Sequence, residues 1–262
     1  MTFSLRKVTA SGLLALAAAA SIAGSTAYLF WLPNVFHLKT ENPKTTAYMQ
    51  IYVRRELVKK RRPLVMTRWA AYDDISSHLR HAVILAEDDM FYQHRGVDWA
   101  ALREAMAYNW RKGKMARGAS TITQQVARNI FLSPARNPLR KIKEMLIAWK
   151  LERALSKNRI LEIYLNIAEW GVGIYGAQAA SQIYFGKDAR DVTAEEAVAL
   201  AAALPSPWKL NPSKPERPWL AKKKTLLIER MRLAGFLPPD IPEQDVILPE
   251  EGELLKHNLN GD

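Results

Sequence analysis

One stretch of the chain reads Ile84-Leu85-Ala86-Glu87-Asp88-Asp89-Met90-Phe91-Tyr92-Gln93-His94-Arg95-Gly96. It places two adjacent carboxylates, Glu87 and Asp88, directly after an apolar run, and an aromatic residue, a histidine and a glycine follow. A carboxyl group that emerges from an apolar surface is poorly solvated, so its pKa rises and it becomes usable as a general acid or base near neutral pH. An ordinary acidic helix end beside a core phenylalanine would have the same residues. Motifs further along the chain must therefore decide between a catalytic carboxylate and a structural helix end.

Composition sets broad limits on what the protein can be. The chain has 262 residues, which is enough for one large domain or two small ones. It has no cysteine, which excludes disulfides and thiolate chemistry. The net charge of +12 favours a polyanionic partner such as nucleic acid, anionic lipid or a phosphorylated substrate. A basic surface that only keeps the protein soluble would give the same net charge.

An uncharged apolar stretch follows Arg6 and Lys7 near the amino terminus. Its centre, Ser11 to Leu32, is long enough to cross a bilayer, which takes about 20 residues, and it ends in aromatic side chains typical of a membrane interface. A cleaved signal peptide is the alternative. The run is longer than the usual apolar region of about 7–15 residues in such a peptide, so an uncleaved anchor is favoured. Charges on both sides of the run leave its orientation open.

The segment from His37 to Pro63 is predicted to be a polar connector with a basic cluster. Near a bilayer this cluster would contact anionic head groups, although a solvated face is the commoner reason for such a run. The members of the cluster are Arg54, Arg55, Lys59, Lys60, Arg61 and Arg62.

Helical patterns and caps dominate the rest of the chain, whereas strand signals are few and no convincing hairpin turn is present, so the predicted fold class is mainly α. The expected helices begin after Asp73–Ser76 and run into Ile84, from Asp98 to Trp110, from Lys157 to about Ala168, from Thr193 to Leu204, and from Trp219 to Leu233.

A cluster of hydroxyl and amide side chains occupies the segment Gly118–Asn129, at the expected start of another helix. Free backbone N–H groups and the helix dipole at such a start can bind an anion. A plain Ser/Thr cap on a polar helix face is the alternative.

Arg140, Lys141 and Glu144 follow at helical spacing, which places Arg140 and Glu144 on one face. On an exposed helix they would form a weak salt-bridge ladder, worth a few tenths of a kcal/mol. In a cleft they would form a phosphate clamp that holds a carboxylate.

In order, these stretches resemble the sequence blocks of one family, the monofunctional peptidoglycan glycosyltransferases, which are similar to the glycosyltransferase domain of class A penicillin-binding proteins. The resemblance covers about Pro63 to Pro218. The matching blocks are Glu87-Asp88 with Phe91, His94 and Gly96; Gly118 through Asn129; Arg140-Lys141 with Glu144; Asn158 through Asn166 with Trp170-Gly171 and Tyr175-Gly176; and Ala201 through Pro205 with Asn211-Pro212.

The resemblance implies a lysozyme-like, two-lobed, mainly α glycosyltransferase domain preceded by a single transmembrane helix. It implies a polymerase that transfers the growing glycan chain from undecaprenyl pyrophosphate to the N-acetylglucosamine 4-hydroxyl of lipid II, with inversion.

The resemblance also places the protein in the bacterial inner membrane, with the amino terminus inside and the catalytic domain in the periplasm. The expected partners are lipid II, the nascent glycan strand and the membrane, with division or elongation synthases as candidates and no nucleic acid. The expected segments are a cytoplasmic tail (1–10), a transmembrane anchor (11–32), a basic membrane-proximal connector (33–62), the glycosyltransferase domain (63–235) and a C-terminal extension (236–262).

The resemblance also assigns residue roles. Glu87 matches the general base, and Glu144 matches a second acidic residue that orients cations or a metal. No cofactor is required with certainty; use of a divalent cation such as Mg²⁺ or Mn²⁺ varies within the family, and Glu144 is the position where it would bind, although the sequence has no independent metal signature. Substrate-binding roles fall on Asp88, His94, Ser120, Gln125, Arg128, Asn129, Arg136, Arg140 and Lys141.

Two other functions fit parts of the same sequence. A lysozyme-like muramidase would also use a buried glutamate in a helical cleft, but a hydrolase of neutral glycan has no pyrophosphate to hold with clustered cations. A membrane-tethered polyanion-binding protein would explain the net charge. It would leave Glu87, Asp88 and Glu144 unexplained, because carboxylates repel phosphate.

Overall fold

The computed structural model describes residues 10–114, 118–135, 137–212 and 218–238. Three parts of the prediction lie outside these ranges: most of the cytoplasmic tail, the substrate-binding residue Arg136 and most of the C-terminal extension. The chain forms two compact units. The first contains the chain up to Arg62 together with Tyr92–Tyr164, and the second contains Pro63–Phe91 and the chain from Leu165 onward.

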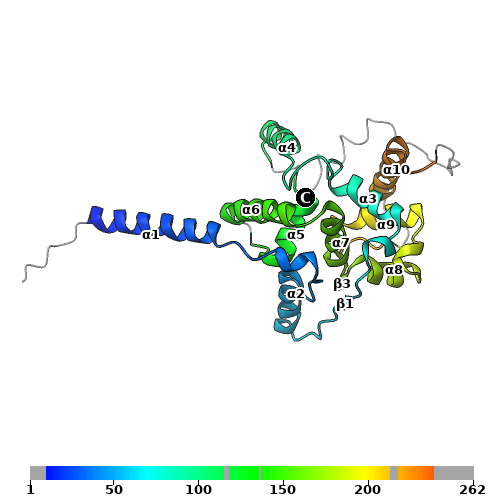
Figure 1. Ribbon diagram of the computed structural model, residues 1–262, viewed down its shortest axis with the longest axis horizontal. Coiled ribbons are helices and arrows are strands. Elements are labelled where there is room, and N and C mark those ends of the chain that lie inside the picture. The colour runs from blue at the N-terminus through cyan, green and yellow to red at the C-terminus, as the bar shows by residue number, and fades with distance from the viewer. Residues whose placement is uncertain (1–9, 115–117, 136, 213–217, 239–262) are drawn as a thin grey trace, which may run out of the picture. The chain divides into compact units, whose positions relative to one another are not determined.

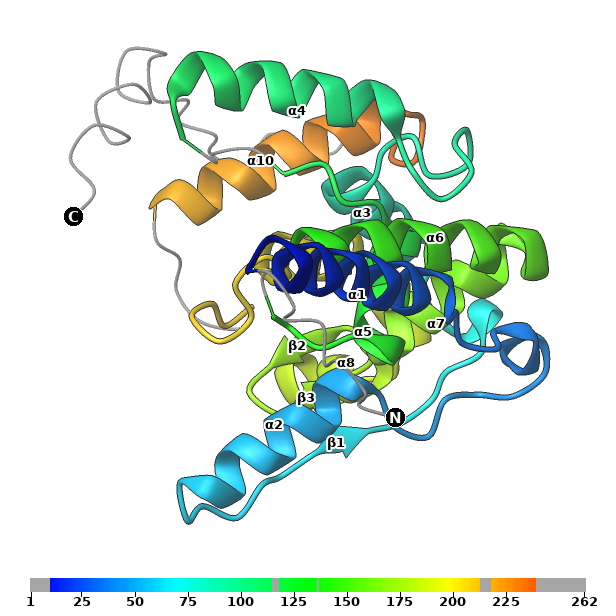
Figure 2. The same cartoon turned by 90° about the vertical axis from the view of Figure 1, so that its left-hand side faces the viewer.

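The described residues of the first unit form helices joined by loops, with no strand among them (Figure 1). Its central helix α6 packs against α5, and α5 also packs against α2. Figure 2 shows α1 in front of α6, with which it is in contact. The elements of this unit are α1 (Ala10–Phe30), η1 (Phe36–Lys39), α2 (Ala47–Val58), α4 (Trp99–Lys112), α5 (Ile122–Phe131) and α6 (Pro138–Ala154); α7 (Lys157–Ile167) begins in it.

Apolar side chains at helical spacing hold α5 and α6 together. Ile122 and Val126 of α5 are fully buried, as are Ile147 and Leu151 of α6. Full burial of a side chain of this size contributes about 1.5–3 kcal/mol, so this seam gives the first unit its core.

The second unit builds its core from three helices. Helix α9 contacts both α3 and α10, and its alanine-rich surface lets the neighbouring backbones approach closely. Its elements are β1 (Met66–Thr67), η2 (Tyr72–Asp74), α3 (Ser77–Glu87), β2 (Glu169–Gly171), β3 (Ile174–Tyr175), α8 (Ala177–Phe185), η3 (Ala189–Asp191), α9 (Ala194–Ala203) and α10 (Pro218–Leu233).

The small sheet of the second unit corrects the expectation that the chain has no hairpin. Its order is β1-β3-β2, with β1 parallel and β2 antiparallel to β3. Strands of two or three residues are too short to give an alternating pattern, which explains why the sequence did not predict them. The side chain of Asn166, near the end of α7, both donates to and accepts from the backbone of Ala70, each at 2.8 Å, and so holds the segment that follows β1.

Most of the predicted helix starts are confirmed. Asp98 accepts a hydrogen bond from Ala101 N, and Thr121 and Thr193 each form a capping box with the residue three positions later. The predicted cap of α3 is wrong in its chemistry: Ser76 precedes the helix, but its hydroxyl donates to Val192 O instead of capping.

Helix α1 covers most of the predicted membrane anchor and contains no charged residue. Within the described residues, no helix is both long and apolar enough to cross a membrane. The anchor over Ser11–Leu32 therefore stays a prediction.

Candidate active site

A buried carboxylate paired with two cations is the main polar feature of the first unit. On α6, Glu144 Oε2 accepts a hydrogen bond of 2.7 Å from Arg140 Nη1, and Oε1 accepts one of 2.6 Å from Lys141 Nζ. The side chain of Glu144 is 1% exposed, that of Arg140 15% and that of Lys141 36%. The carboxylate is therefore sealed beneath its two cations, and the cations form the surface. The weak exposed ladder is the wrong description of this group.

The amino-terminal end of α5 joins the same group. Lys141 Nζ donates to Ser120 Oγ at 2.9 Å and reaches Gln124 Oε1 at 3.4 Å. The side-chain oxygen of Gln124 also accepts from the backbone N–H of Thr121, which closes the capping box. The hydroxyl and amide cluster is thus a helix cap, as one of the two alternatives expected, and it also supports Lys141. Anion binding at this helix start stays a prediction.

Arg140 keeps donors for a further partner. Its Nε donates to Ala135 O at 2.6 Å and one Nη1–H is used by Glu144. A guanidinium has five N–H donors, and the described residues accept no others from it. An anion that approached Arg140 would meet a guanidinium whose rotamer is already fixed.

Arg128 lies on α5 and is only loosely held. Its Nη2 donates to Gln125 at a long 3.4 Å, and its guanidinium stands 5.8 Å from the centroid of the Tyr48 ring. Its Nε is buried and has no hydrogen-bond partner among the described residues. The predicted residue Asn129 is also buried on this helix.

The predicted residue His94 lies in a turn that docks on α6 and α7. Lys157 Nζ bridges His94 O and Glu152 Oε1, each at 2.8 Å, and Thr123 Oγ1 donates to the same carboxylate at 2.6 Å. Gly96 has φ +89° and lies so close to α6 that a Cβ would be 3.1 Å from Ala148 O. The turn therefore needs glycine at this position.

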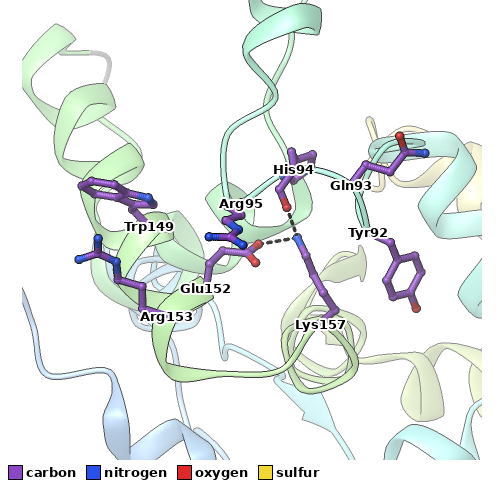
Figure 3. Close-up of a pocket in the computed structure, with 8 residues that line it drawn as sticks. All are labelled: Tyr92, Gln93, His94, Arg95, Trp149, Glu152, Arg153 and Lys157. Atoms are coloured by element: carbon purple, nitrogen blue, oxygen red, sulfur yellow. Dashed lines mark hydrogen bonds and ion pairs between the residues drawn. The ribbon is translucent and has the colours of Figure 1, made fainter.

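A cavity of about 610 Å³ opens beside this turn (Figure 3). Figure 3 shows Lys157 between the loop and α6, with its two interactions drawn as dashed lines. The guanidinium of Arg153 lies 4.4 Å from the Trp149 ring on its rim. The lining residues are Tyr92, Gln93, His94, Arg95, Trp149, Glu152, Arg153 and Lys157.

Glu87 and Asp88 belong to the second unit, at the end of α3. Glu87 is the last residue of the helix and is half-buried, and Asp88 is its C-cap and is buried. Arg230 of α10 donates to Leu85 O at 2.7 Å and to Asp89 Oδ2 at 2.9 Å. The acidic end of α3 is therefore held by a helix much later in the chain.

The structure thus connects only some of the predicted residues directly. Ser120, Arg140, Lys141 and Glu144 form one hydrogen-bonded group, and Gln125 contacts Arg128. The sequence analysis missed a second set of supporting residues, Thr123, Gln124, Glu152 and Lys157. Only Gln124 had a sequence signal, the Thr-x-x-Gln pattern of a capping box.

The surroundings of Glu144 do not fit a divalent cation. Both of its carboxylate oxygens already accept hydrogen bonds from cationic groups, which would repel a metal ion. No group of three or more His, Cys, Asp or Glu side chains within the described residues could hold a metal.

Comparison with known proteins identifies the family. The model of a family described as Transglycosylase matches residues 54–232, more than half of the chain. The biosynthetic peptidoglycan transglycosylase of Nitrosospira multiformis is 41% identical over 210 residues, covering 80% of this chain and 91% of that protein. The chain belongs to the biosynthetic peptidoglycan transglycosylase family.

Two further relatives agree with this membership. The protein of the same name from Thiobacillus denitrificans is 40% identical over 213 residues, covering 81% of this chain and 91% of its own. That from Azoarcus sp. is 44% identical over 177 residues, covering 67% and 76%. This transglycosylase is therefore a glycosyltransferase enzyme of peptidoglycan synthesis, and the resemblance on which the sequence analysis relied is confirmed.

Proposed function

We propose that this transglycosylase polymerises lipid II and that Glu87 is its general base. The observation that carries the proposal is the buried Glu144 with its two paired cations at the start of α5. Cations gathered on a small surface repel one another unless an anion joins them. Glu144 supplies one such anion. The remaining N–H donors of Arg140 are available for a second anion, which we assign to the pyrophosphate.

The reaction follows from these groups. Glu87 takes the proton of the 4-hydroxyl of the acceptor N-acetylglucosamine, and the oxygen attacks C1 of the donor N-acetylmuramic acid as the bond to the lipid pyrophosphate breaks. The configuration at C1 inverts, and the pyrophosphate leaves with the bonding electrons. Arg128, Arg140 and Lys141 stabilise the charge that grows on the leaving group, which accelerates the step because this charge is larger in the transition state than in the ground state.

Glu144 acts through its neighbours. A carboxylate between Arg140 and Lys141 lowers their mutual repulsion and holds each in one rotamer, so little entropy is lost when the pyrophosphate binds. Since both of its oxygens are occupied, we assign it the role of positioning these cations.

We also propose that α1 anchors the enzyme in the inner membrane, with its catalytic part in the periplasm. The helix presents large exposed apolar side chains, among them Leu14, Ile22 and Phe30. Lys143 lies 3.9 Å from the ring centroid of Tyr28, and Lys150 donates to Pro33 O at 2.7 Å. These contacts hold the end of the helix where aromatic side chains would meet the head groups.

The membrane proposal has a direct test. Mass analysis of membrane-extracted protein should find residues 11–32 still attached, and protease added to intact spheroplasts should digest the remainder of the chain. A mature chain that begins near Ser21 or Gly24 would indicate a cleaved signal peptide, and protection from the protease would place the enzyme on the other side.

The reaction is tested with purified full-length protein and lipid II in detergent. Polymer that muramidase digests should accumulate with the wild type. With Glu87→Gln it should form at least about a hundredfold more slowly, the usual contribution of a general base. Glu104→Gln, at an exposed carboxylate of α4, is the control. Near-normal turnover by Glu87→Gln would contradict the assignment of the base. Cleavage of finished glycan by the wild type, without polymer from lipid II, would support the muramidase instead.

A further inference from the structure

The basic cluster lies at the carboxyl end of α2 and takes no part in the proposed reaction. Six of the nine residues from Arg54 to Arg62 are lysine or arginine, and all six are exposed. Glu56 carries the one negative charge in this run, so six positive charges and one negative charge leave a net charge of +5. Its carboxylate is buried and lies 3.6–3.7 Å from nitrogens of Arg55, Lys59 and Arg61. The run therefore keeps a strong positive potential.

Two apolar side chains are exposed within the same run. Leu57 is 58% exposed and Val58 is 79% exposed. The packed face of α2 is a different one, because Met49, Tyr52 and Glu56 recur at helical spacing, are buried, and belong to a helix that contacts α5. Cations in the last turn of a helix favour its dipole, but this does not account for apolar side chains exposed beside them.

The connector between α1 and α2 is fastened to the first unit. Lys150 Nζ donates to Pro33 O at 2.7 Å, just after the end of α1. Arg159 donates from Nε to Leu38 O at 2.9 Å and from Nη2 to Asn42 Oδ1 at 2.7 Å. Helix α2 therefore has a fixed place relative to the end of α1, and Figure 1 shows it running across the direction of α1. With α1 as the membrane anchor, α2 runs along the plane of the bilayer, as interfacial helices do.

We propose that the basic cluster, together with Leu57 and Val58, is a docking surface for the anionic phospholipid head groups of the bilayer that α1 enters. Lysine and arginine side chains are attracted to the negative potential of such a surface, and apolar side chains enter the boundary between head groups and acyl chains. A soluble polyanion would meet the charges and leave the apolar side chains in water. A bilayer matches both features.

This inference rests on the proposed anchor and adds a second contact with the membrane. A single spanning helix leaves the rest of the first unit free to turn about the helix axis, whereas a second contact fixes its orientation. Because the anchor already holds the chain at the bilayer, docking of the cluster is an intramolecular step and needs little affinity of its own.

The absence of cysteine from the chain gives a direct test, because Val58→Cys provides a single point for an environment-sensitive fluorophore. The full-length labelled protein is reconstituted into vesicles of phosphatidylcholine, with or without phosphatidylglycerol. In the anionic vesicles the emission should shift to shorter wavelength, and lipids with a nitroxide near the head group should quench it. Salt at about 1 M should reverse the shift, because the Debye length is then only about 3 Å. A label at Glu195→Cys, an exposed residue of α9, should give the same emission in both kinds of vesicle.

The role of charge is tested in the labelled protein by removing two cations of the cluster, with Arg54→Gln and Arg62→Gln together. Each lysine or arginine near an anionic surface changes binding by about fivefold, so the docking constant should fall about thirtyfold. This constant is obtained from the emission as a function of the phosphatidylglycerol fraction. Arg68→Gln with Lys209→Gln, at exposed cations of the second unit, removes the same charge and should leave the constant unchanged.

Flotation of the vesicles separates this inference from the anchor on which it rests. Protein that floats with both kinds of vesicle while the label at position 58 stays in water would overturn the docking surface and leave the anchor. Protein that floats only with anionic vesicles, with a shifted label, would support the docking surface without the anchor. Protein that floats with neither would overturn both.

Two other results would also overturn the proposal. An equal shift of the label in neutral and anionic vesicles would assign the contact to the apolar side chains alone. A shift produced by soluble polyglutamate without vesicles would assign the surface to an acidic polypeptide. Should Val58→Cys not fold, Leu57→Cys, at the neighbouring exposed position, allows the same measurement.

Discussion

Arg140 Nη1 lies 2.7 Å from Glu144 Oε2, across one turn of α6, and the carboxylate that it contacts is 1% exposed. A buried ion pair is not by itself a gain in stability, because taking both charges out of water offsets their attraction. The pair with Glu144 instead fixes the rotamer of Arg140, whose guanidinium keeps N–H donors that Glu144 does not use. We therefore propose that the pair prepares Arg140 to bind an anion.

Arg140→Ala should reduce lipid II polymerisation by tenfold to about a hundredfold, since a hydrogen bond to a charged group contributes about 1.5–3 kcal/mol. It should also weaken binding of moenomycin, a phosphoglycolipid that resembles the donor in this family. Initial rates and inhibitor titration measure the two effects. Arg153→Ala, on the same helix but stacked on Trp149, is the matched control. Unchanged polymerisation and inhibitor binding in Arg140→Ala would show that the cation serves only the fold.

Glu144→Gln should destabilise the protein by about 3–5 kcal/mol, because it leaves two partly buried cations without their counter-charge. Denaturant unfolding in detergent measures the difference. Glu104→Gln, at an exposed carboxylate of α4, should be close to neutral. The prediction fails if the two substitutions have similar effects on the free energy of unfolding.

Gly96→Ala should be more destabilising than Gly113→Ala. Both glycines have positive φ, +89° and +62°, and the left-handed conformation costs a residue with a Cβ about 1–2 kcal/mol. A Cβ on Gly113 would meet open space, whereas one on Gly96 would lie 3.1 Å from Ala148 O and 3.2 Å from Glu152 Cγ. The additional crowding should make Gly96→Ala worse by at least about 1 kcal/mol. Equal melting temperatures for the two variants would contradict the close approach of this turn to α6.

His81 should make the protein less stable in mild acid. Burial lowers its pKa from the ordinary value of 6.5, and the nearby Arg80 and His78 lower it further. As the pH falls through 6.5 the unfolded chain binds the proton first, so stability declines until the pH passes below the lower pKa of the folded state. The His81 ring also stacks on Phe236 with 3.7 Å between ring centroids.

The measurement for His81 is the melting temperature between about pH 7.5 and pH 5. His81→Phe keeps the aromatic stack and removes the titrating group, so it should flatten the decline. His37→Phe, at a histidine of η1 in the first unit, should not. A slope that is unchanged by His81→Phe would assign the acid sensitivity to other groups.

Much of the helical framework could be predicted because its signals are local. The caps at Asp98, Thr121 and Thr193 act within three or four residues, and so does the spacing that brings Arg140 and Glu144 together. The two-residue and three-residue strands could not be predicted, because they are defined by their partners rather than by their own pattern.

The sequence by itself determined which residues we propose for the chemistry: a carboxylate after an apolar run, and cations at helical spacing with a second carboxylate among them. Only the tertiary structure decided how these groups are held. Glu144 lies beneath Arg140 and Lys141, and Lys141 in turn contacts Ser120 and Gln124 at the start of α5. Lys157 reaches His94 across 63 positions of sequence, and Lys223 reaches α9 across 21. Local backbone geometry depends on neighbouring residues, so the sequence predicts it. Burial and long-range charge contacts depend on how helices far apart in the chain pack together.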